Sequence, residues 1–473
     1  MLIICTAALS SFTVDCERMS KEKSLYIAIT SVDWERLRNK LLPEDNNETA
    51  AVLLCGASAG ESERRLLVRR TVEVPPHLYR SRNRHHLEIA PEFYNEIITD
   101  CERSKLTPVI IHSHPFEGQA WYSASDNYGE SRLLPVLASL LPEASPSSLV
   151  VTKTAITGRR FVKECFVPLA GLKVFGRRSQ ILEFTVDDEA SIHSQFERQV
   201  RAFGESGQRL IQKIKVGVIG VGGIGSLVVE QLARVGITDL VIVDDDRIEL
   251  SNVSRILGSQ LNDAGRNKVE VVGAHAKALG VGKVLPLADS SIRQAILLRL
   301  RDRDIIINCV DNDRSRAIIN RFSHQYLVPV VDLGTRLDGR SGAVDAAAGR
   351  VSLIGSGMTC LRCSHHLNTE RIRAESMSAH ERKGLQREGY VMGIDEPVPA
   401  VISLNTVIAG LGVTAALNLF VGLTGDQQPL GQIYDARSGS VFAIDAIHEA
   451  GCDICDESLG VKGLGDTQIV SAY

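Results

Sequence analysis

The sequence predicts an α/β protein in which two domains share one chain of 473 residues. The first sign is a glycine loop, Gly220-Val221-Gly222-Gly223-Ile224-Gly225, placed between a short apolar segment and an apolar helix. The second is an earlier series of strand-like segments, one of which ends on His112-Ser113-His114-Pro115. The third is a pair of Cys-x-x-Cys motifs near the C-terminus, which suggest metal binding before disulfide formation.

The composition is that of a folded protein. Hydrophobic residues make up 44% and charged residues 23%, which argues against large-scale disorder. The net charge of −4 gives no electrostatic reason to expect nucleic acid or a membrane surface as a partner. Residues 1–24 are interpreted as an N-terminal extension. Because the opening lacks the basic segment of a signal peptide, we expect a cytoplasmic protein.

The N-terminal domain is predicted over residues 25–168. Short apolar segments rich in β-branched residues favour strands, and Ser31 favours the start of a helix. Strands are expected at 25–29, 51–56, 65–74, 108–111, 147–152 and 160–167, and helices at 31–42 and 90–101. Residues 169–192 carry little pattern and are interpreted as a linker.

Two histidines stand at the end of the strand predicted at 108–111. His112 and His114 face the same way because strand side chains alternate, so both imidazoles can bind one metal ion. Asp126, in a predicted loop, offers a carboxylate as a third ligand. Two His and one carboxylate with an open position are typical of hydrolytic zinc sites. The alternative is that these are polar loop residues without a ligand.

These motifs resemble those of the JAMM (MPN+/JAB) metalloproteases, which use a Glu, His-x-His-Pro and Ser-x-x-Asp. The resemblance implies His112, His114 and Asp126 as ligands of a catalytic Zn²⁺, Glu48 as general acid/base and Ser123 as stabiliser of the tetrahedral intermediate. Eight residues separate His114 from Ser123, where the family usually has seven. Members of this kind cut after the C-terminal glycines of ubiquitin-like proteins.

The second domain is predicted over residues 193–473. A helical lead-in at 196–210 precedes a strand at 215–219, the glycine loop and a helix at 226–233. Glycines let backbone N–H groups approach a phosphate, and the helix N-terminus adds positive potential. Asp244 ends the next strand at the place of a ribose-binding carboxylate. This pattern predicts a nucleotide site without choosing between NAD, FAD and ATP.

Further charged residues favour a nucleoside triphosphate. Arg255 and Lys268 can neutralise phosphates, and Asp311, after the strand predicted at 305–310, can hold Mg²⁺. A hydride-transfer enzyme needs none of the three.

This combination resembles the ThiF/MoeB/HesA family, whose fold is shared with ubiquitin-activating enzymes. Such enzymes bind ATP–Mg²⁺ and adenylate the C-terminal glycine of a ubiquitin-like partner. The resemblance implies a Rossmann-like doubly wound fold, a homodimer, and a role for each matched position: Gly220, Gly222, Gly223, Gly225, Asp244, Asn252, Arg255, Lys268 and Asp311 at the ATP, and Arg198 reaching the ATP of the opposite subunit.

The Cys-x-x-Cys motifs predict one structural Zn²⁺, with a redox pair as the alternative. Four thiolates in two such pairs suit a closed tetrahedral site; they are Cys360, Cys363, Cys452 and Cys455. The ThiF family carries zinc at corresponding positions. Residues 364–451, where thioester-forming relatives place a cysteine, contain none. The apolar segment 397–420 is interpreted as a core or dimer-interface helix and not as a membrane span.

Together these features predict a bifunctional enzyme that acts on a ubiquitin-like protein with a C-terminal Gly-Gly. The N-terminal domain is predicted to cleave at that tail in a zinc-dependent reaction. The second domain is predicted to adenylate the carboxylate of the tail with ATP, after which the acyl group passes to a sulfur donor or carrier thiol protein. Two alternatives remain at this point: an NAD(P)-dependent oxidoreductase, and a non-catalytic scaffold that retains both folds.

Overall fold

The computed structural model describes residues 23–184, 191–340, 343–378, 381, 399–425 and 428–470. Its contacts divide the chain into two compact units. Unit 1 contains the described residues up to Val174, then residues from Gln180 and the segment Gly463–Gln468. Unit 2 contains Phe175–Ser179, the described residues between 191 and 462, and residues 469 and 470. The predicted extension 1–24 lies almost wholly outside the described residues.

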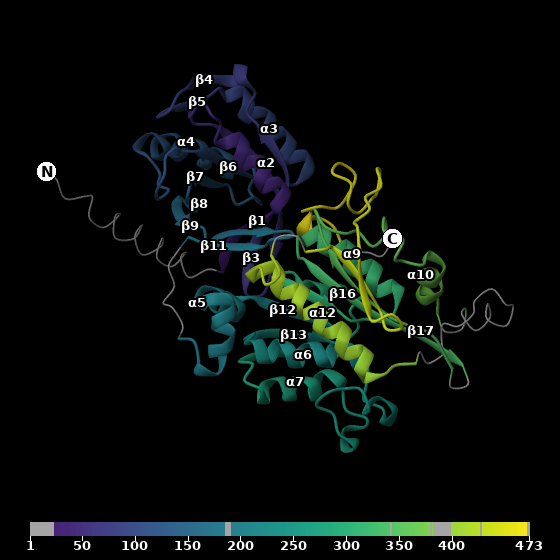
Figure 1. Cartoon of the computed structure of the whole chain (residues 1–473). Helices are drawn as coiled ribbons and strands as arrows, with labels where there is room; N and C mark the ends of the chain where they lie inside the picture. The colour runs from purple at the N-terminus through teal and green to yellow at the C-terminus, as the bar shows by residue number, and fades with distance from the viewer. Residues whose placement is uncertain are drawn as a thin grey trace. The chain divides into compact units, whose positions relative to one another are not determined.

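Unit 1, coloured mainly purple to blue in Figure 1, is built on one mixed sheet. Among the described residues its strand order is β11-β10-β1-β3-β2-β6-β7-β8-β9. Its strands are β1 Ser24–Thr30, β2 Ala50–Ala59, β3 Glu63–Glu73, β6 Thr107–Ser113, β7 Ser147–Val151, β8 Ile156–Val162, β9 Cys165–Pro168, β10 Gly171–Phe175 and β11 Gln180–Glu183. A small hairpin pairs β4 Tyr79–Arg82 with β5 Leu87–Ile89. The helices are α2 Ser31–Leu41, α3 Pro91–Ser104 and α4 Ala124–Leu140.

Two apolar clusters hold this sheet to its helices. One face packs on α2 through residues such as Leu37 and Leu41, and the other packs on α3 and α4 through Phe93, Ile97 and Leu134. Because helices cover both faces of this sheet, central strands such as β6 and β7 are buried at every residue, which explains why they read as continuous apolar segments in the sequence.

Three expectations for unit 1 were wrong. The predicted linker 169–192 contains strands β10 and β11, whose apolar residues complete the sheet. The single strand predicted at 160–167 is two strands, because the turn at Lys163 and Glu164, both with positive φ, reverses the chain. Ser123 and Asp126 do not lie in a loop but at the start of α4. In addition, Gly463–Gln468 lies in unit 1 and not in the domain predicted at 193–473.

Unit 2 is a doubly wound sheet with an antiparallel extension. Among its described residues the strand order is β14-β13-β12-β15-β16-β17-β18-β19, and the first five strands are parallel. The strands are β12 Lys215–Ile219, β13 Asp239–Val243, β14 Lys283–Leu287, β15 Ile305–Asn308, β16 Val330–Arg340, β17 Ala343–Ile354, β18 Gly431–Asp435 and β19 Ser440–Ile444. The order reverses between β12 and β15, so the carboxyl ends of these two strands form a switch point where such folds bind ligands.

The helices of unit 2 are α5 Glu197–Lys213, α6 Gly223–Val235, α7 Lys268–Ala278, α8 Gln294–Leu300, α9 Asp313–Tyr326, α10 Thr369–Ser376 and α12 Ile402–Val421. Helices α6, α7, α9 and α12 pack on the sheet, whereas α5 packs on α12 and α10 packs on α9. The apolar α12 lies beside α6 and over β16 and β17 (Figure 1). By length and composition α12 could cross a membrane, but 67% of its apolar window is buried inside the structure, as expected for a core helix.

Candidate functional site

A cavity of about 290 Å³ opens at the switch point of unit 2. Its lining includes Gly220 and Gly222 from the glycine loop and Asp244 after β13. Gly220 has φ of +80°, and a Cβ on Gly225 would clash with the carbonyl oxygen of Gly220. The tight turn therefore requires glycine at both positions. Helix α6 begins at Gly223, within the glycine loop and three residues before the predicted start at 226, because the last glycines of the loop already form its first turn.

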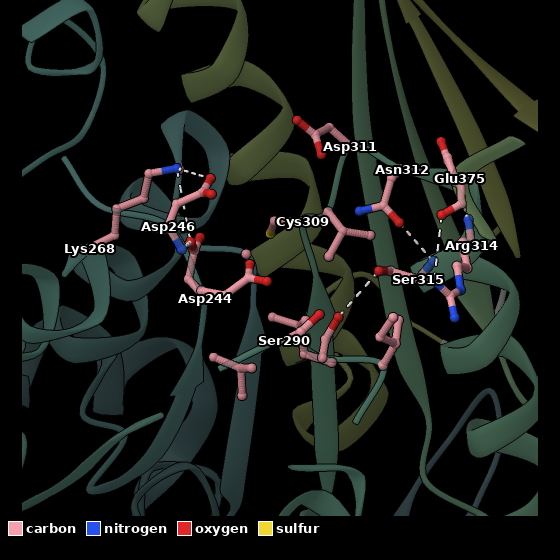
Figure 2. A pocket seen from close by; sticks show the side chains of 18 residues that line it. Asp244, Asp246, Lys268, Ser290, Cys309, Asp311, Asn312, Arg314, Ser315 and Glu375 are labelled. Carbon is pink, nitrogen blue, oxygen red and sulfur yellow. Dashed lines mark hydrogen bonds and ion pairs between the residues drawn. The ribbon is translucent and has the colours of Figure 1, made fainter. Parts of the chain in front are cut away.

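Asp244 and Lys268 lie on one side of this cavity (Figure 2). The Asp244 carboxylate accepts hydrogen bonds of 2.8 Å from the backbone N–H of Val221 and 2.9 Å from that of Asp246. Lys268 Nζ donates to Asp246 Oδ2 at 2.6 Å and lies 3.9 Å from Asp244 Oδ1. Burial raises the pKa of Asp244, and the charge of Lys268 opposes this rise. This side of the cavity therefore carries the ammonium group of Lys268 between the carboxylates of Asp244 and Asp246.

The other side is formed by the segment that follows β15 (Figure 2). Strand β15 ends at Asn308, two residues before the predicted end, and Asp311 lies exposed in the loop that lines the cavity. Asn312 caps α9 by accepting from the backbone N–H of Ser315 at 2.8 Å. Glu375 accepts from the backbone N–H of Arg314 at 2.7 Å.

Sequence reasoning missed Arg314 and Glu375 as lining residues. Arg314 directly follows the strand-end motif, so its position could have been noticed. Glu375 comes from α10, more than fifty residues later, and no local pattern indicates it.

The other predicted nucleotide residues are placed differently. Arg255 donates from Nη1 to the Ser251 carbonyl at 2.8 Å, and its side chain lies against Gly223. Asn252 is buried, and its Oδ1 accepts from the backbone N–H of Glu249 at 3.3 Å. Arg198 is exposed on α5 and is not among the described residues that line the cavity.

A second cluster lies in unit 1 and joins three predicted ligands. Three possible ligand atoms lie within 4.8 Å of one another, one from each of His112, His114 and Asp126. Nε2 of His112 and Nε2 of His114 each lie 3.3 Å from a carboxylate oxygen of Asp126. Strand β6 supplies His112, the residue after its end supplies His114, and the first turn of α4 supplies Asp126.

This cluster fits a divalent metal ion. Nε2 of His112 is buried and makes no hydrogen bond in the described structure, although a carboxylate oxygen is nearby. A buried imidazole nitrogen without a partner is costly unless a ligand completes it. Glu48 Oε1 lies 3.9 Å from His114 Nε2, and burial raises the pKa of the Glu48 carboxyl. A carboxyl beside the cluster is in a position to accept and return a proton.

Ser123 makes a structural contact that is separate from its predicted role as stabiliser of the tetrahedral intermediate. Its Oγ accepts from the backbone N–H of Asp126 at 3.1 Å, and Asp126 Oδ2 accepts from the backbone N–H of Ser123 at 2.7 Å. This reciprocal capping box starts α4. The same carboxylate therefore both caps the helix and faces the two histidines.

The four cysteines of the Cys-x-x-Cys motifs form a third cluster. One sulfur from each of Cys360, Cys363, Cys452 and Cys455 fall within 4.8 Å of one another, and none of the four is in a disulfide. Cys363 Sγ and Cys455 Sγ are 3.5 Å apart. A hydrogen bond from the Cys455 thiol lowers the pKa of Cys360 to about 4. Four sulfurs that converge in this way fit a tetrahedral metal ion.

Comparison with known proteins matches residues 196–452 to the model of the ThiF family. The tRNA threonylcarbamoyladenosine dehydratase of Haemophilus influenzae is 31% identical over 127 residues, 26% of this chain and 48% of that protein. Ubiquitin-like modifier-activating enzyme 5 of Aedes aegypti is 27% identical over 240 residues, 45% of this chain and 56% of that protein. The chain thus spans about half the length of these curated relatives.

Among solved structures, that of E. coli MccB with ATP aligns with a TM-score of 0.44 and 18% identity, covering 57% of this chain and 76% of MccB.

Proposed function

Because this chain belongs to the ThiF family, we propose that unit 2 uses ATP to adenylate a carboxylate. The observation that carries the proposal is the cavity at the switch point, which gathers the glycine loop, Asp244, Lys268 and Asp311. In this reaction a carboxylate oxygen attacks the α-phosphorus, the bond to the β-phosphate breaks, and an acyl-adenylate and pyrophosphate form. Hydride transfer does not account for a lysine held beside two carboxylates in this cavity.

We assign each residue a role in that reaction. Backbone N–H groups of the glycine loop approach the phosphates, and Asp244 accepts from the ribose hydroxyls. Lys268 would turn from Asp246 to the phosphates, and Arg255 and Asn252, which do not line the cavity in the described structure, would approach the same phosphates. Asp311 would hold Mg²⁺, which would stabilise the negative charge that grows on the leaving pyrophosphate.

The proposed substrate is the C-terminal Gly-Gly of a ubiquitin-like protein, and the proposed acyl acceptor is a sulfur donor or carrier thiol. The relative whose name denotes a ubiquitin-like modifier-activating enzyme supports this choice. The relative that modifies tRNA favours a second candidate, the carboxylate of a modified tRNA nucleoside. We further propose a cytoplasmic homodimer in which Arg198 serves the neighbouring subunit.

ATP–pyrophosphate exchange tests the adenylation. We expect exchange that depends on a protein ending in Gly-Gly and is lost in Lys268→Ala. Lys277→Ala, an exposed lysine on the same helix, is the matched control and should keep full exchange. Exchange that requires tRNA and ignores the Gly-Gly protein would favour the second candidate. Exchange with neither would contradict the proposal.

For unit 1 we propose a zinc-dependent peptidase of the JAMM type, which cleaves at the Gly-Gly tail of a ubiquitin-like protein. The convergence of His112, His114 and Asp126 with Glu48 supports it. When bound, zinc supplies a Lewis acid that lowers the pKa of water toward about 7. In this proposal Glu48 takes and returns the proton, and the Ser123 hydroxyl donates to the developing oxyanion. For the four cysteines we propose one structural Zn²⁺.

A further inference from the structure

Arg159 contacts the start of helix α4 on both sides of Asp126. It belongs to β8, where it stands in register with Ser148 of β7. Its Nη1 donates at 2.6 Å to Oδ1 of Asn127, the residue after Asp126. Its guanidinium carbon also lies 3.7 Å from the ring centre of Tyr122, the residue before Ser123. One side chain from the sheet therefore borders the segment 122–127 at each end.

A buried carboxylate completes this network one turn further along α4. Arg159 Nε donates to Glu130 Oε2 at 2.8 Å, and its Nη2 lies 2.7 Å from the same oxygen. Ser148 Oγ donates to that oxygen at 2.8 Å. Burial raises the pKa of Glu130, while the charge of Arg159 opposes the rise. Because an unpaired buried carboxylate is costly, Arg159 and Glu130 depend on each other.

The network is rigid by its construction. Arg159 is packed between the rings of Tyr122 and Phe166, whose centre lies 4.1 Å from its guanidinium carbon. The Tyr122 hydroxyl donates to the carbonyl of Ser148 at 2.9 Å. A planar guanidinium held by two rings and two acceptors has one orientation, which lysine cannot reproduce. The first turn of α4 is thereby fixed to the sheet that carries His112.

We propose that Arg159 is a positioning residue, which sets the distance of the Asp126 carboxylate from His112 and His114 and so the affinity of this cluster for a divalent metal ion. The proposal rests on the metal site proposed for unit 1. Arg159 touches none of the three ligand side chains in the contacts described, so its effect passes through Asn127, Glu130 and Tyr122. Outer partners of metal ligands commonly contribute about 10–100-fold in metal affinity.

The test is a competitive chelator titration of the zinc-loaded full chain. His112→Ala removes the unit 1 site, so the difference between wild type and His112→Ala cancels the metal held by the four cysteines. We expect Arg159→Gln to weaken the unit 1 site roughly 10–100-fold and Arg159→Lys to restore little of it. Arg132→Gln is the matched control, because Arg132 is exposed on α4 and its hydrogen bond within the described residues goes to the Tyr128 hydroxyl, away from the three ligands.

Asn127→Ala keeps the test valid if Arg159→Gln does not fold. It removes one acceptor and no charge, and we expect a several-fold loss of metal affinity with an unchanged melting temperature. Equal affinities in wild type, Arg159→Gln and Asn127→Ala would overturn the positioning role while leaving the metal site in place. If wild type and His112→Ala bind the same amount of zinc, the metal site itself is wrong and the inference falls with it.

Discussion

The carboxylate of Asp466, seven residues before the last residue of the sequence, accepts a hydrogen bond of 2.9 Å from the backbone N–H of Ala59 in β2. The segment around it packs backbone against backbone. A Cβ on Gly463 would lie 2.8 Å from the carbonyl oxygen of Val68, and one on Gly465 would clash with the carbonyl oxygen of Ala57. Residues Gly463–Gln468 are therefore part of the packing of unit 1.

Gly465→Ala should lower the stability of unit 1 by more than a left-handed backbone alone explains. Gly465 has φ of +56°, a region that costs a non-glycine residue about 1–2 kcal/mol, and the clash with Ala57 adds to this cost. Gly118→Ala is the control, because Gly118 also has positive φ but has open space around it. Both tryptophans, Trp34 and Trp121, lie in unit 1, so fluorescence during urea unfolding reports this unit. Equal midpoints for the two variants would contradict the expectation.

The four-cysteine cluster predicts a loss of metal and of stability together. Cys360→Ser should lower bound zinc by about one ion per chain and destabilise unit 2, because structural zinc contributes directly to folding. Cys309→Ala should keep the full zinc content, since Cys309 lies outside the cluster. Metal analysis and calorimetry of the purified chain measure both quantities. Unchanged zinc in Cys360→Ser would exclude the site.

The positions that can be predicted from the sequence are local ones. The glycine loop, Asp244 and the His-x-His pair each follow a buried strand, and a parallel strand places its end residues at one edge whatever the rest of the chain does. The pattern Ser123-x-x-Asp126 is typical both of a metal-binding loop and of a capping box that starts a helix, and the structure has the capping box. Both interpretations use the same carboxylate, which the structure shows.

The features that were missed depend on contacts between distant segments. Glu375 reaches the nucleotide cavity from α10, and Asp466 reaches β2 across 407 residues. Arg159 directly precedes the strand that the sequence predicts at 160–167, and nothing in that segment indicates its contacts with α4. No periodicity or spacing within one segment carries this information, because tertiary packing alone brings such residues together.

Glu48 and His114 should separate chemistry from metal binding in unit 1. Glu48→Ala should abolish cleavage of a ubiquitin-like protein fused after its Gly-Gly to a reporter peptide, while the zinc stays bound, because a proton acceptor is lost but no ligand. His114→Ala should lose both. Glu44→Ala, an exposed carboxylate on the same loop, is the control and should cleave normally. Full cleavage by Glu48→Ala would show that the base has been assigned wrongly.

Arg198 should act across a dimer interface. Arg198→Ala should lose ATP–pyrophosphate exchange yet remain a dimer. To test this, equal amounts of Arg198→Ala and Lys268→Ala are unfolded together and then refolded, so that about half of the dimers contain one subunit of each variant. If Arg198 completes the neighbour's site, each mixed dimer has one intact site out of two, and roughly a quarter of the wild-type activity should return. No restoration, with mixed dimers confirmed by mass, would show that Arg198 serves its own subunit or none. A fully active monomer would also contradict the proposal.

Variants of Asp311 and Cys309 test how the proposed acyl-adenylate is made and used. Asp311 lines the cavity from which we propose that pyrophosphate leaves, so Asp311→Ala should bind the Gly-Gly partner but adenylate it about 10²–10³-fold more slowly, whereas Asp245→Ala should change the rate little. Cys309 also lines this cavity, but burial raises the pKa of its thiol, which leaves it a poor nucleophile. Residues 364–451 offer no cysteine. Wild type should therefore accumulate a non-covalent acyl-adenylate, and non-reducing mass spectrometry should find no thioester. A DTT-sensitive adduct that is absent from Cys309→Ala would instead make this cavity thiol an acyl carrier.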